Sequence, residues 1–230
     1  MLQLPKVIGH RGAAAYAPEN TLDSFREARR RGATWVETDV KLTSDGVPIL
    51  MHDESLKRTT GVDRLVAETA RAELPTGVPT FEEAIACFAE LDLGCNVEIK
   101  PCPGREAETA EIAVGTLRRC WPRHLPAPLL SSFKDASLAA ARGAAPEFER
   151  ALLLDAFVED WQARADVLGA AGINTTGKRL TAPWACAIKQ AGFALVVYTI
   201  DDPAVARALF GMGVDCVITD APDVILAVAG

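Results

Sequence analysis

The sequence predicts a (β/α)8 barrel, and two observations carry this prediction. Eight short apolar segments alternate with helix-like segments along the 230 residues, which is typical of parallel strands joined by helical crossovers. Polar and charged residues follow several of these apolar segments, at the strand ends where a barrel carries its functional residues. A chain of this length is also common for a single α/β barrel, so we expect one domain over residues 1–230.

The expected elements alternate regularly from the N-terminus. The expected strands lie at residues 6–9, 34–40, 96–100, 129–132, 151–154, 172–175, 194–199 and 216–219. The helix-like stretches lie at residues 20–31, 80–91, 106–120, 134–142, 159–170, 182–190 and 203–212. Gly32 and Gly192 each follow a helical stretch closely, as residues that end helices do. In the segment "APENT", we expect Asn20 to cap the first helix.

One segment departs from this alternation. After the second expected strand, Asp45 and Gly46 form a turn signal between two strand-like runs. This predicts a hairpin whose returning strand, "VPILMHD", ends at His52 and Asp53. An irregular stretch follows from about residue 54 to residue 77. We therefore expect a small insertion after the second barrel strand, beside the mouth of the barrel.

Composition argues against several classes of protein. The formal net charge of −7 disfavours a nucleic-acid partner. No apolar run approaches the roughly 18 residues of a membrane span, and the N-terminus lacks the apolar segment of a secretion signal. Six cysteines occur without CxxC pairs, so we expect reduced thiols. These features predict a cytoplasmic protein of an oligomeric state that the sequence does not reveal.

Three carboxylates fall near the ends of two neighbouring expected strands. Glu37 and Asp39 lie two residues apart, and Glu98 lies near the end of the third strand. The period of two in a strand points Glu37 and Asp39 to the same face. Three converging acids repel one another unless a cation neutralises them, and oxygen ligands suit one Mg²⁺ or Ca²⁺ ion. The alternative is that each acid is separately hydrogen-bonded or solvated.

Two histidines and two cations follow strand-like runs in the same way. His10 and His52 could act together as general acid and base near neutral pH. Arg11 offers a planar fork that matches phosphate oxygens, and Lys100 could add a second positive charge. The alternatives are structural histidines and a surface arginine. His124 lies in the proline-rich "WPRHLPAP", where we expect a structural role.

The chain carries a series of short motifs in a fixed order. They are "HRG" at 10–12, "PENT" at 18–21, "ETDV" at 37–40, "DG" at 45–46, "HD" at 52–53, "EIK" at 98–100, "SSF" at 131–133, "VYTIDDP" at 197–203 and "GVDCVITDAPD" at 213–223. This ordered set resembles the glycerophosphodiester phosphodiesterase family, in particular its cytoplasmic bacterial branch. The resemblance covers nearly the whole chain.

The resemblance implies a barrel enzyme that hydrolyses glycerophosphodiesters to sn-glycerol 3-phosphate and an alcohol such as choline or ethanolamine. It implies these roles: catalytic acid and base for His10 and His52, metal ligands for Glu37, Asp39 and Glu98, and phosphate contacts for Arg11 and Lys100. The family also tends to carry an insertion after its second barrel strand. Tyr198 stands where many members have tryptophan, a departure that bears on the shape of the glycerol or alcohol pocket.

Two other functions fit the same motifs. A lysophospholipid or sphingolipid phosphodiesterase on a related barrel would differ in the leaving group, which a comparison of glycerophosphocholine with lysophosphatidylcholine would reveal. A phosphate-binding barrel without catalysis would bind a diester and leave it intact. For the enzyme, the sequence leaves open which histidine is the base. It equally leaves open whether a glycerol hydroxyl attacks first, giving a cyclic phosphate, or water attacks directly.

Overall fold

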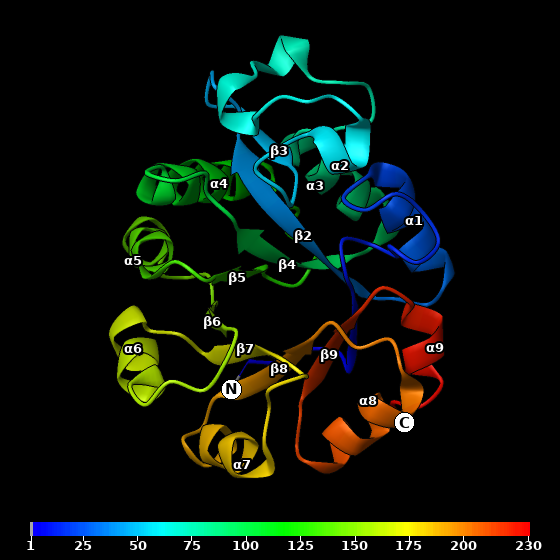
Figure 1. Cartoon of the computed structure of the whole chain (residues 1–230), viewed down its shortest axis with the longest axis vertical. Helices are drawn as coiled ribbons and strands as arrows, with labels where there is room; N and C mark the ends of the chain where they lie inside the picture. The colour runs from blue at the N-terminus through cyan, green and yellow to red at the C-terminus, as the bar shows by residue number, and fades with distance from the viewer. Residues whose placement is uncertain (1) are drawn as a thin grey trace.

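Eight parallel strands close into a barrel in the computed structural model, which describes residues 2–230 (Figure 1). The barrel strands are β1 (Val7–Gly9), β2 (Trp35–Leu42), β4 (Gly94–Ile99), β5 (Leu129–Ser132), β6 (Arg150–Leu154), β7 (Gly172–Thr176), β8 (Ala194–Tyr198) and β9 (Cys216–Thr219). The barrel closes because β1 pairs in parallel with both β9 and β2. This arrangement confirms the predicted (β/α)8 fold.

Helices surround the barrel and follow its strands in turn (Figure 1). They are α1 (Leu22–Arg30), α3 (Phe81–Leu91), α4 (Glu106–Cys120), α5 (Asp135–Ala144), α6 (Trp161–Leu168), α7 (Ala182–Gln190), α8 (Pro203–Gly211) and α9 (Pro222–Leu226). The sequence did not predict α9, because five residues are too few to show a helical period. Within residues 2–230, no helix is both long and apolar enough to cross a membrane.

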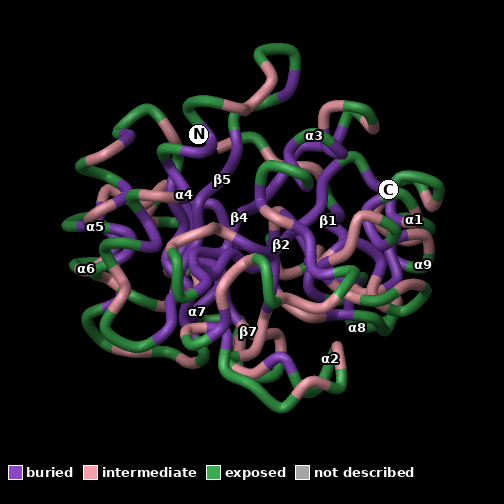
Figure 2. The backbone as a smooth tube through the Cα atoms, turned by 90° about the horizontal axis from the view of Figure 1, so that it is seen from above, coloured by how far each residue is buried: buried purple, intermediate pink, exposed green. Residues whose placement is uncertain are grey.

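Apolar residues fill the space between strands and helices and also the interior of the barrel toward the end where the strands begin. In Figure 2 the buried backbone gathers on the central strands and the exposed backbone lies on the outer loops and helices. The interior cluster is formed by residues at or near the starts of their strands, Trp35, Leu129, Ala151 and Cys216, and by residues further along theirs, Ile8, Val196 and Ile218. Because this end is packed, the free space of the barrel lies toward the carboxyl ends of its strands.

The predicted hairpin and insertion follow β2. Strand β3 (Pro48–Leu50) pairs antiparallel with β2 outside the barrel, with Val40 opposite Leu50. The chain then forms α2 (Lys57–Thr60) and two short 3-10 turns, Val66–Glu68 and Arg71–Glu73, the cyan segments of Figure 1. Leu56, Val66 and Val78 are buried in a small apolar cluster beneath these turns. Strand β3 ends before His52, so this histidine lies in a loop and not, as expected, in the strand.

Candidate active site

The predicted site residues come together at the mouth of the barrel. Six of them line one pocket of about 290 Å³: His10, Arg11, Glu37, His52, Glu98 and Lys100. The seventh, Asp39, is 1 % exposed and lies 3.5 Å from the Lys100 ammonium. His124 lies apart from this group, exposed and 3.6 Å from Asp92. The structure therefore assembles the seven residues from four segments of the chain.

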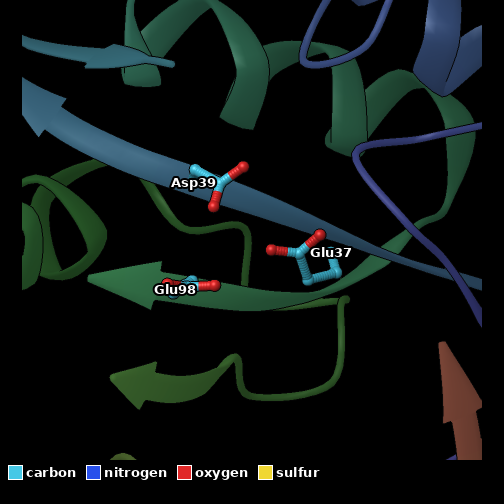
Figure 3. A group of neighbouring side chains, drawn as sticks. All are labelled: Glu37, Asp39 and Glu98. Atoms are coloured by element: carbon cyan, nitrogen blue, oxygen red, sulfur yellow. The ribbon is translucent and has the colours of Figure 1, made fainter. Parts of the chain in front are cut away.

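Three carboxylates form the centre of the site. Glu37 and Asp39 project from β2 and Glu98 from β4, and the three side chains point toward one another (Figure 3). Each offers an oxygen within 4.8 Å of the oxygens of the other two. This convergence follows from strand register, since Asp39 lies directly opposite Glu98 in the parallel pair of β2 and β4. The period of two along β2 then adds Glu37 on the same inward face.

The three acids lack sufficient neutralising partners. Burial, and next the charge of Asp39, raise the pKa of Glu37 and of Glu98. Burial would also raise the pKa of Asp39, but the charges of Lys100 and Arg11 outweigh it and the pKa is lowered. The buried Oδ1 of Asp39 has no hydrogen-bond partner among the described residues. Oxygen donors of this kind, crowded and under-partnered, fit a hard divalent cation.

Asn20 holds one of these carboxylates in place. Its Nδ2 donates to Asp39 Oδ2 at 2.8 Å, and its Oδ1 accepts from the Thr38 hydroxyl at 2.7 Å. The expectation that Asn20 caps α1 is therefore wrong. Thr21 is the cap, and its hydroxyl accepts from the Ser24 N–H at 3.2 Å. Asn20 adopts a left-handed φ of 55°, which turns its side chain away from the helix and toward β2.

The "HRG" turn requires its glycine. Gly12 has a φ of 94°, and a Cβ added there would lie 2.1 Å from Ser24 Oγ. That hydroxyl donates to the Arg11 carbonyl at 2.6 Å and accepts from the Ala13 N–H at 2.9 Å. The Arg11 N–H in turn donates to Glu37 Oε2 at 3.1 Å. The start of α1 thus fixes the turn that places His10 and Arg11 beside the carboxylates.

Each catalytic candidate histidine contacts a carboxylate through Nδ1. In His10 this atom lies 2.6 Å from Asp220 Oδ1, and in His52 it lies 2.6 Å from Asp53 Oδ1. A carboxylate on one ring nitrogen orients the ring and leaves the other nitrogen for the pocket. His10 Nε2 lies 3.9 Å from Glu37. Sequence reasoning missed the role of Asp220, although it belongs to the quoted "TDAPD" segment.

The two histidines differ in electrostatic environment. Burial would lower the pKa of His10, but the hydrogen bond with Asp220 and the charge of Glu37 outweigh it, so the pKa is raised. Burial lowers the pKa of His52 despite the opposing effects of Asp39 and Asp53.

The two candidate phosphate-binding cations lie against the acidic cluster. Arg11 Nη1 donates to Glu19 at 2.7 Å, and its Nε lies 3.2 Å from Asp39 Oδ2. Lys100 Nζ donates to Glu98 at 3.1 Å. These contacts place positive charge on the rim of the pocket, within reach of an anionic ligand that enters it.

Comparison with known proteins identifies the family of this chain. Residues 10–224 match the model of the glycerophosphoryl diester phosphodiesterase family. The chain belongs to this family. The match confirms both the family and the enzyme class that the motifs predict.

Solved structures and curated relatives of the family support this assignment. A phosphodiesterase of Oleispira antarctica, solved in complex with the product sn-glycerol-3-phosphate, has a TM-score of 0.95 and 37 % identity, covering 98 % of this chain and 96 % of that chain. A glycerophosphodiester phosphodiesterase of Caldanaerobacter subterraneus is 28 % identical over 96 % of both chains. The human glycerophosphoinositol inositolphosphodiesterase is 62 % identical over 58 residues, which are 25 % of this chain and 11 % of that protein.

Proposed function

We propose that this member of the glycerophosphoryl diester phosphodiesterase family hydrolyses glycerophosphodiesters to sn-glycerol 3-phosphate and an alcohol, within one domain over residues 1–230. The observation that carries the proposal is the pocket itself, which gathers three carboxylates, two carboxylate-held histidines and two cations. The complex of the Oleispira antarctica relative with sn-glycerol-3-phosphate supports the choice of product.

The carboxylates would hold one divalent cation, Mg²⁺ or Ca²⁺. Glu37, Asp39 and Glu98 are the residues that fit it, because their oxygens converge and the buried Oδ1 of Asp39 has no hydrogen-bond partner among the described residues. When bound, such an ion supplies positive charge to the phosphate oxygens and lowers the pKa of an attacking water or hydroxyl.

Arg11 and Lys100 would bind the substrate phosphate. A phosphodiester is an anion that repels an incoming nucleophile, so the attack requires neutralisation of its charge. The guanidinium of Arg11 can bond two phosphate oxygens, and the Lys100 ammonium adds a point charge. Because both cations are anchored on acids of the cluster, they are oriented before the substrate arrives.

His10 and His52 would move the protons. One accepts the proton of the attacking oxygen, and the other delivers a proton to the oxygen that leaves with the alcohol. Asp220 and Asp53 hold the two rings through Nδ1, so the transferring nitrogen is Nε2 in each case. The same two proton transfers serve attack by water and attack by a glycerol hydroxyl.

A substrate panel tests the proposed function. The purified chain, supplied with Mg²⁺ or Ca²⁺, is incubated separately with glycerophosphocholine, glycerophosphoethanolamine, glycerophosphoinositol and lysophosphatidylcholine. The phosphorylated product released from each substrate is measured. We expect sn-glycerol 3-phosphate from at least one glycerophosphodiester. Turnover of lysophosphatidylcholine alone would instead identify a lysophospholipid phosphodiesterase. Binding of every diester without any turnover would identify a non-catalytic barrel.

A further inference from the structure

Three buried polar side chains in the barrel lack hydrogen-bond partners. Asn96 on β4, Ser131 on β5 and Asn174 on β7 are at most 2 % exposed. Both amide atoms of Asn174, Oδ1 of Asn96 and the Ser131 hydroxyl form no hydrogen bond with any residue in the described range. We call these three residues the polar floor. Because buried polar groups are nearly always partnered, the polar floor indicates a partner that the chain does not supply.

The polar floor belongs to the same pocket as the acidic cluster. All three residues line it, together with the apolar side chains of Leu153 and Ile218. In the closed order of strands, β7 lies opposite β2, so Asn174 faces the strand that carries two of the acids. The pocket is therefore lined by Glu37 and Glu98 on one side and by Asn174 on the other.

Depth along the strands separates the polar floor from the phosphate-binding cations. Asn96 precedes Glu98 by two residues and Lys100 by four. The Lys100 ammonium reaches back to Glu98, to which it donates at 3.1 Å, so at about 3.3 Å per residue Asn96 lies roughly 7 Å deeper along β4 than the Glu98 level. Ser131 is the register partner of Glu98 on the neighbouring strand. A ligand whose phosphate is held by Lys100 and Arg11 can therefore reach the polar floor with its far end, because all of these residues line the same pocket.

We propose that the polar floor binds the terminal hydroxyl of the glycerol unit and that Asn174 is a specificity-determining residue. This inference rests on the proposed function, because it assigns a subsite to the glycerophosphodiester. An amide both donates and accepts hydrogen bonds, as a hydroxyl requires, while Leu153 and Ile218 contact the glycerol carbons. A substrate without that hydroxyl leaves the buried amide unpaired, so the subsite selects against it.

A pair of substrates that differ in one hydroxyl tests this inference. Glycerophosphocholine is compared with propane-1,2-diol phosphocholine, which lacks only the terminal hydroxyl and keeps the hydroxyl next to the phosphate ester. We expect the wild type to prefer the glycerol substrate by about 10- to 100-fold in kcat/KM. Equal use of both substrates by the wild type would overturn the inference.

Three variants locate the effect. Asn174→Leu removes the polar atoms and keeps a similar side-chain volume. It should reduce the preference for glycerophosphocholine in kcat/KM to about threefold or less, because activity on this substrate falls. Thr175→Val is the matched control, because its hydroxyl donates to the Leu154 carbonyl on β6 and the residue lies on the opposite face of β7. It should keep the wild-type preference. If Asn174→Leu does not fold, Ser131→Ala replaces it and should lower the preference by at least about threefold. If the variant that folds, Asn174→Leu or Ser131→Ala, keeps the wild-type preference for glycerophosphocholine, the inference is contradicted.

A binding measurement keeps this inference separate from the proposed function. If the wild type hydrolysed neither substrate, the proposed function would fail. Calorimetry with sn-glycerol 3-phosphate and with propane-1,2-diol 1-phosphate would then test the polar floor alone. Tighter binding of the glycerol compound by about 10-fold or more in the wild type, lost in Asn174→Leu, supports the inference. Equal binding of the two compounds by the wild type overturns it.

Discussion

Arg58 of the insertion contacts Glu19 of the first barrel loop through both terminal nitrogens, each at 2.7 Å from a carboxylate oxygen. Its Nε donates to Asp53 Oδ2 at 2.5 Å. Asp53 contacts the ring of His52, and Glu19 accepts from Arg11 at 2.7 Å. A chain of charge-assisted hydrogen bonds thus runs from His52 to Arg11 through a residue of the insertion. The insertion therefore helps to position residues of the site.

Replacement of Arg58 should impair the site without abolishing the fold. In Arg58→Ala the carboxylates of Glu19 and Asp53 lose their shared partner, so Arg11 and His52 become less well oriented. We expect kcat/KM to fall about 10-fold. Arg64→Ala is the control in the same insertion, because the Arg64 side chain pairs with the exposed side chain of Glu73, at 3.1 Å. Equal activity of both variants would show that the chain of contacts does not support catalysis.

The same contacts should make the free energy of unfolding depend on pH in the acidic range. Hydrogen bonds from Arg58 are the main cause of the lowered pKa of Asp53. Burial would raise the pKa of Glu19, but the contacts with Arg58 and Arg11 outweigh it and lower the pKa. A lowered folded-state pKa stabilises the fold above the unfolded value of about 4, and this stabilisation is lost as the pH falls through the folded value.

The free energy of unfolding, measured by chemical denaturation from pH 3 to 7, checks this dependence. We expect the difference between wild type and Arg58→Ala to be constant from about pH 5.5 to 7 and to shrink below about pH 4.5. The free energy of unfolding of Arg64→Ala should stay closer to that of the wild type over this pH range. A difference between wild type and Arg58→Ala that is independent of pH would argue against the ion-pair explanation.

Asn20 should support metal binding rather than the helix. Asn20→Gly removes the hydrogen bond to Asp39 while tolerating the left-handed φ. We expect affinity for Mg²⁺ or Ca²⁺ to fall about 10- to 100-fold in a metal titration, as for other residues that orient metal ligands. Thr21→Ala should lower stability by about 1 kcal/mol through loss of the cap and leave the affinity unchanged. If the two variants bound metal equally, the assignment to Asn20 would be wrong.

The sequence predicts the barrel well because its strands are short apolar segments with clear ends. Each expected barrel strand begins and ends within two residues of the observed one. The shorter elements α2 and α9 were missed because four or five residues show no period. The convergence of Glu37, Asp39 and Glu98 could be expected from alternation along neighbouring parallel strands.

The residues that support the site could not be predicted from local pattern. Asn20 stands at a helix start, where a capping role fits the sequence, and only the left-handed backbone directs its side chain to Asp39. Asp220 lies 210 residues from His10 along the chain, so their contact depends on closure of the barrel between β9 and β1. Arg58 lies in an irregular segment, where no periodicity indicates which way a side chain points.

The two histidines should be essential for turnover. His10→Ala and His52→Ala should each lower kcat by on the order of 10²-fold or more, the range expected for loss of general acid-base catalysis. His124→Ala is the control, since His124 lies exposed beside Asp92 and should leave kcat unchanged. Wild-type kcat in both His10→Ala and His52→Ala would refute the proposed proton transfers.

The central claim is that the three carboxylates hold a divalent cation on which glycerophosphodiester hydrolysis depends. The most direct test measures release of sn-glycerol 3-phosphate from a glycerophosphodiester substrate before chelation, after treatment with EDTA, and after addition of Mg²⁺ or Ca²⁺. Our account predicts that EDTA abolishes the release and that at least one of the two ions restores it in the wild type but not in Asp39→Asn. Full activity of the chelated wild-type enzyme would contradict it.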